Sequence, residues 1–218
     1  PGQFGRYPFP ELAGVGVAAK LAGALAAGQE SPCLQLAALG TVADMVPLVG
    51  ENRLIVTLGL KEMNANPLPG IAALAQAAGL TPGHLEAEDI AFGLAPRLNA
   101  AGRMDSADPA LALLLEEDGT AASLSAARLD EDNRLRRRTE GEIFGLALLQ
   151  AQEQVRRGRR VLVVHGEDWH PGVIGIVAAR ILEHYYRPTL VLSGSGELTG
   201  SARSVAGFNI HGALTAAA

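Results

Sequence analysis

The sequence of 218 residues is poor in cysteine and contains no long apolar run. Its single cysteine, Cys33, excludes an internal disulfide and a zinc site built from cysteines, and a reducing cytoplasm permits it. No apolar run approaches the roughly 20 residues that span a bilayer. The opening PGQFGRYPFP also lacks the basic and apolar regions of a signal peptide. We therefore expect a cytoplasmic protein without a membrane segment.

Lysine is scarce too, because only Lys20 and Lys61 among the 18 basic residues are lysines. The formal net charge of -5 at pH 7 means that the overall field repels nucleic acid. Any nucleic-acid site must then depend on local clusters of positive charge, for which the planar fork of arginine suits phosphate.

An initiating methionine is missing, and the sequence stops at GALTAAA, where a helix begins. We therefore expect the chain to be a piece of a longer protein. Its hydrophobic content of 48% excludes disorder and allows one large core or two small ones.

Apolar spacing predicts that the first half of the chain is mostly helical. The stretch from Glu11 to Ala27, followed by Gly28 as a C-cap, has the pattern of a buried helix. Four further segments have helical or buried patterns, at 33–39, 52–63, 71–78 and 87–98.

The stretch from Thr120 to Arg157 contains no proline and predicts one helix of roughly 55 Å. Its middle part, DEDNRLRRRTEGE at 130–142, is charged nearly all round. Because such a helix usually bridges two domains through solvent, we expect a domain boundary there.

After Arg160 the pattern changes to that of a βαβ unit. VLVV at 161–164 and TLVLS at 189–193 have the composition of strands, with an apolar helix at 173–182 between them. A parallel pair joined by a crossover helix indicates a small α/β domain, with 197–204 as a further strand or loop.

Asp44 lies in ALGTVADMVPL, after an apolar stretch and before Pro47, where a helix or strand must stop. A carboxylate there suits Mg²⁺ or Mn²⁺, which prefer oxygen ligands, but a two-metal site needs several carboxylates. Taken alone, the local sequence favours an N-cap or turn role for Asp44. Asp89, Asp105 and Asp108 lie at predicted helix starts, so the remaining ligands are expected upstream.

The segment PRLNAAGRMDSADP places Asn99 and Arg103 four residues apart, hence on one face if the segment is helical. With Gly102 allowing close approach of a ligand to the backbone, this pair could hold a phosphate. Solvent exposure or an ion pair for Arg103 is the competing interpretation. Asp105, Ser106 or Asp108 is expected to cap the next helix.

HGEDWHPGVIGIVAARI follows a predicted strand and opens a helix, so backbone N–H groups near Gly172 could bind an anion that His170 approaches. The alternative is an ordinary strand-to-helix turn in which Trp169 packs and His170 hydrogen-bonds locally.

GELTGSARS brings Ser201, Arg203 and Ser204 together after Gly200, and two hydroxyls with a guanidinium could clamp a phosphate. A polar strand edge would have the same composition. The arginine runs at 134–138 and 156–160 are interpreted as solvated helix faces, with a nucleic-acid track as the alternative.

Taken together and in this order, ALGTVADMVPL, RLNAAGRM, HPGVIGIVAARI and GSARS resemble the RecJ exonucleases of the DHH phosphoesterase family. YPFPELAGVGVAAKLA is similar to the RecJ segment after the DHH signature, so the resemblance covers nearly the whole chain. It implies an α/β fold, with the mostly helical end of a DHH domain at 1–119, a connecting helix at 120–157 and a partial DHHA1-type domain at 158–218.

By the same resemblance, Asp44 is a catalytic metal ligand, and Asn99, Arg103 and His170 line the cleft, with His170 in a catalytic role. Ser201, Arg203 and Ser204 fall in a phosphate-binding motif. The DxD pair, the next aspartate and the DHH triplet are absent from this sequence, as is the OB-type module that follows in RecJ proteins.

The resemblance implies a 5′→3′ exonuclease specific for single-stranded DNA, in repair and recombination, that uses two Mn²⁺ or Mg²⁺ ions. This chain alone is expected to be inactive. Helicase or single-strand-binding proteins are possible partners. Two alternatives stay open: a phosphodiesterase for short oligonucleotides or phosphorylated nucleotides, and a non-catalytic scaffold, against which the retained Asp44 counts.

Overall fold

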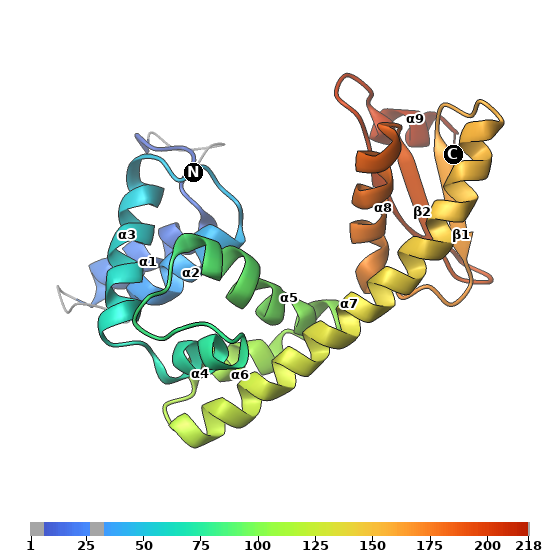
Figure 1. The fold of residues 1–218 in the computed structure, drawn as a ribbon. Helices are drawn as coiled ribbons and strands as arrows, with labels where there is room; N and C mark the ends of the chain where they lie inside the picture. The colour runs from blue at the N-terminus through green and yellow to red at the C-terminus, as the bar shows by residue number, and fades with distance from the viewer. Residues whose placement is uncertain (1–6, 27–32, 218) are drawn as a thin grey trace. The chain divides into compact units, whose positions relative to one another are not determined.

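The computed structural model describes residues 7–26 and 33–217, which divide into two compact units (Figure 1). The first unit runs to Asn133 and the second begins at Arg134. The division falls inside one helix, α7 (Gly119–Arg156), and the two units are described separately below.

Unit 1 is helical in its described residues, as its apolar spacing predicts. Besides the first part of α7, its elements are α1 (Gly14–Leu25), α2 (Cys33–Ala43), α3 (Gly50–Ala65), α4 (Pro69–Ala77), the π-helix η1 (Asp89–Leu94), α5 (Ala95–Met104) and α6 (Asp108–Leu115). The predicted C-cap Gly28 lies outside the described residues, and α1 ends at Leu25.

Helix α3 buries a different face from the one that its leucines suggest. Leu54 and Leu58 are 58% and 41% exposed, whereas the buried stripe consists of Asn52, Val56, Gly59 and Met63. A Cβ on Gly59 would lie 2.3 Å from the Ala38 Cβ, so glycine is required where α2 and α3 cross. The close crossing of two helices therefore selects the buried face.

The predicted helix at 87–98 contains a π-helical segment, which the apolar pattern did not indicate. At the end of η1 the Ala95 N–H donates to the Ile90 carbonyl, five residues back. Pro96 follows, and proline lacks an N–H and clashes with the carbonyl four residues earlier, so a wider turn before it relieves the clash.

The long helix predicted from the absence of proline is confirmed as α7. Its buried apolar positions are alanines together with Leu129 and Ile143, whereas Leu124, Leu146 and Leu149 are well exposed. No helix in the described ranges combines the length and apolar character needed to cross a membrane.

The expectation that the charged middle of α7 lies in solvent holds only in part, because Arg134, Arg137 and Arg138 are exposed while other polar residues are covered. Asp130 and Asn133 are buried, and the side chains of Arg136 and Glu140 are each only 13% exposed. Burial is tolerated because the charges are paired: Arg97 contacts Asp130 within unit 1, while Arg136 and Arg180 both contact Glu140 within unit 2.

Unit 2 contains the predicted βαβ arrangement. Strands β1 (Leu162–Gly166) and β2 (Thr189–Ser193) are parallel, and α8 (Pro171–Tyr185) connects them. The segment predicted as strand or loop contains β3 (Thr199–Arg203), which pairs antiparallel with β2, and α9 (Ile210–Ala217) follows. Helix α8 packs against β2 and β3.

A polar cluster near the start of unit 1 joins α1 to α3. The Tyr7 hydroxyl donates to both Glu51 carboxylate oxygens at 2.7 and 2.8 Å, and the Lys20 amine lies 2.6 Å from Glu51. Hydrogen bonds from Lys20 and then Tyr7 lower the pKa of Glu51, and the same contact with Glu51 raises the pKa of Lys20.

Candidate functional site

Asp44 follows α2 directly and is exposed in a turn. Its N–H donates to the Gly40 carbonyl at 3.0 Å, so the residue ends a helix. Asp44 therefore lies in a turn and is not an N-cap, because caps that use a carboxylate occur at helix N-termini. The Asp44 side chain has no hydrogen-bond or ion-pair partner in the described part of the chain.

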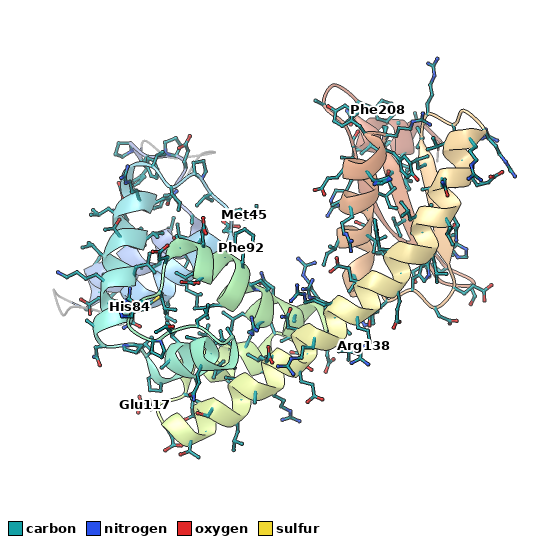
Figure 2. The ribbon with its side chains drawn as sticks, viewed as in Figure 1. Met45, His84, Phe92, Glu117, Arg138 and Phe208 are labelled. Carbon is teal, nitrogen blue, oxygen red and sulfur yellow. The ribbon has the colours of Figure 1, made fainter. Side chains whose placement is uncertain are left out.

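The next residue, Met45, has a left-handed backbone with φ of 56° and a side chain that is 89% exposed. A non-glycine residue in this conformation costs on the order of 1–3 kcal/mol, and such strain is found at functional sites. Nothing in the sequence signalled it, since helices that end this way usually have glycine there. Figure 2 shows Met45 and Phe92, which is 80% exposed, at the same edge of unit 1 in that view.

Asn52, which the sequence reasoning missed, fastens the loop that follows Asp44. Its buried amide donates to the carbonyls of Pro47 at 3.1 Å and Glu11 at 2.8 Å, and its oxygen accepts from the Ala13 N–H at 3.3 Å. The signal was an asparagine on an otherwise apolar helical stripe. A buried amide with three partners makes the turn after α2 rigid.

Asn99 and Arg103 both lie in α5, so the condition for sharing one helix face is met. Both are exposed and have no partner among the described residues. Gly102 is not needed for close approach within unit 1, since a Cβ there would meet the Ala107 Cβ at an ordinary 3.5 Å.

The N-cap of α6 is Ala107, which makes no side-chain cap bond, so the expectation that Asp105, Ser106 or Asp108 caps this helix is wrong. The neighbouring residue Ser106 forms a local turn instead. Its hydroxyl oxygen accepts from the Asp108 N–H at 3.1 Å, and its hydroxyl donates to the Asp108 carboxylate at 2.8 Å. Asp108 is thus engaged locally at the first residue of α6.

Arg97, in the same motif, was not singled out from the sequence. Its Nε donates to Asp130 at 2.9 Å, and its Nη1 donates to the Gly93 carbonyl in η1 at 2.6 Å. Arg97 therefore ties the irregular turn before α5 to α7, and it holds in place the helix that carries Asn99 and Arg103.

His170 is the N-cap of α8, where its Nδ1 accepts from the Gly172 N–H at 3.1 Å. The local hydrogen bond of the alternative interpretation is thus present. This hydrogen bond also determines the tautomer of the His170 ring. A ring nitrogen that accepts a hydrogen bond carries no proton, so the neutral imidazole carries its proton on Nε2. Trp169 packs as that interpretation expects, with its ring so close to Gly166 that a Cβ there would lie 2.3 Å from it.

Ser201 and Arg203 lie on β3 and face α8. Arg203 Nη1 donates to the Ser201 hydroxyl oxygen at 3.1 Å and to the Ala202 carbonyl at 2.9 Å. A Cβ on Gly175 of α8 would lie 3.1 Å from the Ser201 hydroxyl oxygen and 3.4 Å from Arg203 Nη2. Glycine at 175 therefore leaves the space that these two side chains occupy.

Ser204, the third residue of this motif, has a structural role. Its hydroxyl donates to the Phe208 carbonyl at 2.7 Å, which closes the turn after β3. Unit 2 thus brings Ser201 and Arg203 together over α8, while Ser204 serves the adjoining loop.

Within the described residues, no three histidine, cysteine, aspartate or glutamate side chains are grouped so that they could hold a metal ion. Asp44 contributes a single carboxylate, and a hard cation needs several oxygen ligands. The described residues therefore do not form a metal site by themselves, and of the predicted ligands they contain only Asp44.

Known proteins resemble this chain over nearly its whole length. Residues 158–218 match the DHHA1 domain family. The single-stranded-DNA-specific exonuclease RecJ of Bacillus subtilis is 44% identical over 212 residues, which are 96% of this chain and 27% of that protein. The protein of the same name from Escherichia coli is 37% identical over 230 residues, or 95% of this chain and 40% of that one.

Solved structures of RecJ proteins also resemble this chain. Thermus thermophilus RecJ in complex with Mg²⁺ has a TM-score of 0.75 and 38% identity, covering 85% of this chain and 29% of that chain. An exonuclease RecJ bound to manganese is 37% identical and has the same TM-score, with a match that covers 84% of this chain and 45% of that chain. The chain thus spans between 27% and 45% of the length of these relatives.

Proposed function

We propose that the complete protein is a 5′→3′ exonuclease specific for single-stranded DNA. The proposal starts from two findings: this chain is homologous to part of the RecJ exonucleases, and it carries a DHHA1 domain at 158–218. We assign 1–119 to the DHH-type domain, 120–157 to the connecting helix and 158–218 to the DHHA1-type domain. The proposal includes a cytoplasmic role in DNA repair and recombination, with helicase or single-strand-binding proteins as possible partners.

The observation that carries this proposal is a pair of side chains on β3, Ser201 and Arg203, that can donate hydrogen bonds to a phosphate. Arg203 uses Nη1 within unit 2, which leaves the N–H groups of Nη2 and Nε without a partner in the described residues. Because the Ser201 oxygen accepts from Arg203, its own proton is available to a ligand. A guanidinium and a hydroxyl held side by side suit a phosphate of the DNA backbone.

We assign roles to three further residues, of which one lies in unit 2 and two lie in unit 1. His170, held by its cap, presents Nε2–H as a donor, and we assign it a catalytic role near the reacting phosphate. Asn99 and Arg103 on one face of α5 would orient a phosphate in unit 1.

Asp44 would supply one oxygen ligand to Mn²⁺ or Mg²⁺, the two metals found in the related structures. Bound in such a site, the ions supply activation of water and stabilisation of the leaving oxygen. The strained, rigid turn at the end of α2 keeps the carboxylate exposed and away from other partners of the described chain.

The chain of 218 residues should not degrade single-stranded DNA by itself, because one carboxylate cannot hold two hard cations and position a water. The measurement is release of label from 5′-labelled and 3′-labelled single strands in Mn²⁺, with the complete protein as the positive control. Metal-dependent degradation by the chain alone would contradict the assignment of the missing ligands to other parts of the protein.

Gly175→Ala tests whether Arg203 and Ser201 bind phosphate. The new methyl group would lie 3.1 Å from the Ser201 hydroxyl oxygen, so the Ser201 side chain, to which Arg203 donates, must move by a few tenths of an ångström. Moving a side chain off its rotamer costs about 0.5–1.5 kcal/mol. Single-strand affinity in the complete protein should fall about two- to tenfold, as measured by fluorescence anisotropy.

Gly145→Ala is the matched control, since this glycine lies in α7 with nothing within 4 Å of an added Cβ. Alanine favours a helix over glycine by about 1 kcal/mol at either position, so neither variant should lose thermal stability. Equal affinities for the two variants and the parent would argue that the β3 pair does not touch DNA.

A further inference from the structure

The outer edge of β1 is closed by two glutamine side chains from α7. The Gln150 amide donates to the His165 carbonyl at 2.7 Å and accepts from the His165 N–H at 3.0 Å. Gln154 does the same at Val163, with distances of 2.6 and 3.0 Å. In the described residues β2 is the neighbouring strand of β1, so no other strand lies on this edge.

The spacing of the two glutamines along α7 matches the spacing of Val163 and His165 along β1. Residues i and i+4 of a helix are about 6.0 Å apart along its axis, and residues i and i+2 of a strand are about 6.6 Å apart. Alternate residues of a strand present their N–H and C=O groups to the same edge. The Leu162 N–H donates to the Pro188 carbonyl on the β2 side, so Val163 and His165 face the other way.

Each glutamine thereby makes the paired bonds that a residue of an adjacent strand would make. A primary amide offers one acceptor and two donors, so it can bind both backbone groups of one residue at once. We propose that Gln150 and Gln154 substitute for a missing strand and make residues 134–156 of α7 a structural part of the domain whose family match begins at 158. This inference is independent of the proposed exonuclease function.

Gln150 also acts as a positioning residue for the end of β1. His165, which it holds, contacts the Gly194 carbonyl through Nε2 at 2.7 Å, on the loop after β2. β1 ends at Gly166, on which Trp169 packs, and the Trp169 carbonyl accepts from the Ser193 hydroxyl. The loop so held leads directly to His170 and its cap on α8.

The other contacts between α7 and the helices of unit 2 point in the same direction. Glu140 binds Arg180 of α8 at 3.1 Å, and the Arg180 guanidinium lies over the Phe144 ring at 3.8 Å from its centroid. Helix α7 is thus fastened both to α8 and to the edge of the sheet, as an element of the domain and not as a free linker.

The test is backbone hydrogen exchange in the complete protein, read at the Val163 and His165 amides. The double variant Gln150→Leu/Gln154→Leu should speed exchange at these two amides at least about tenfold relative to the parent, because their N–H groups lose their acceptors. Gln152→Leu, an exposed position without a partner in the described residues, is the control and should leave both rates unchanged. Unchanged exchange in the double variant overturns the proposal.

Gln150→Glu/Gln154→Glu keeps the inference falsifiable if the leucine variant unfolds. An ionised carboxylate still accepts from the N–H but repels the carbonyl, whereas a protonated carboxyl group restores both bonds. Exchange at Val163 and His165 should therefore exceed that of the parent at pH 7 and approach it near pH 4, around the usual pKa of about 4.3 for glutamate. An excess that is the same at both pH values overturns the strand-substitute role.

Discussion

Asp44→Asn in the complete protein should lower the rate of single-strand cleavage by orders of magnitude while leaving thermal unfolding almost unchanged. Asparagine preserves the shape of the side chain but removes the negative charge that a divalent cation requires. Folding should not suffer, because Asp44 is exposed and its side chain has no partner in the described residues. The measurement is cleavage rate against Mn²⁺ concentration, with a melting curve for each variant.

Asp118→Asn is the matched control for Asp44→Asn. The Asp118 carboxylate accepts from the Ala121 N–H at 2.8 Å at the start of α7, and asparagine caps helices as well as aspartate does. Its cleavage rate should be nearly normal. If Asp44→Asn retained more than about a tenth of the parent rate, a loss under ~1.4 kcal/mol, Asp44 would be a turn residue and not a metal ligand.

Arg203→Ala should weaken single-strand binding. It should also reduce the slope of the logarithm of the affinity against the logarithm of the salt concentration by about one. The reason is that each phosphate contact releases condensed ions, so its loss changes both the affinity and the slope. Ser201→Ala should act more mildly, because it removes one neutral donor and no charge. The measurement is the single-strand dissociation constant across a salt titration.

Arg138→Ala removes the same charge from the exposed surface of α7, where Figure 2 labels the residue. It serves as the control under the interpretation of 134–138 as a solvated helix face, in which this arginine contributes to the overall field but makes no phosphate contact. Its salt slope should equal that of the parent. A slope for Arg203→Ala that matches the parent's would mean that GSARS is only a polar strand edge.

Several features were predictable because local pattern determines them. The absence of proline over nearly 40 residues gave α7, and the change from helical to strand composition after Arg160 gave the βαβ unit. The candidate site residues were singled out from local motifs. The roles given to Asp44, Asn99, Arg103, His170 and the residues of GSARS follow from the resemblance and stay predictions. The structure places Ser201 and Arg203 together while engaging Ser204 elsewhere.

Other features depended on which surfaces meet in three dimensions. The sequence alone indicated where most helices and strands form, since backbone preference and apolar period are local properties. Only the tertiary structure decided that α3 buries Asn52 and exposes Leu54 and Leu58, that the buried Asp130 and the half-buried Glu140 pair with arginines, and that Gln150 and Gln154 close a strand edge. The physical reason is that a polar side chain is buried only where a partner distant in sequence satisfies it, and local pattern does not reveal that partner.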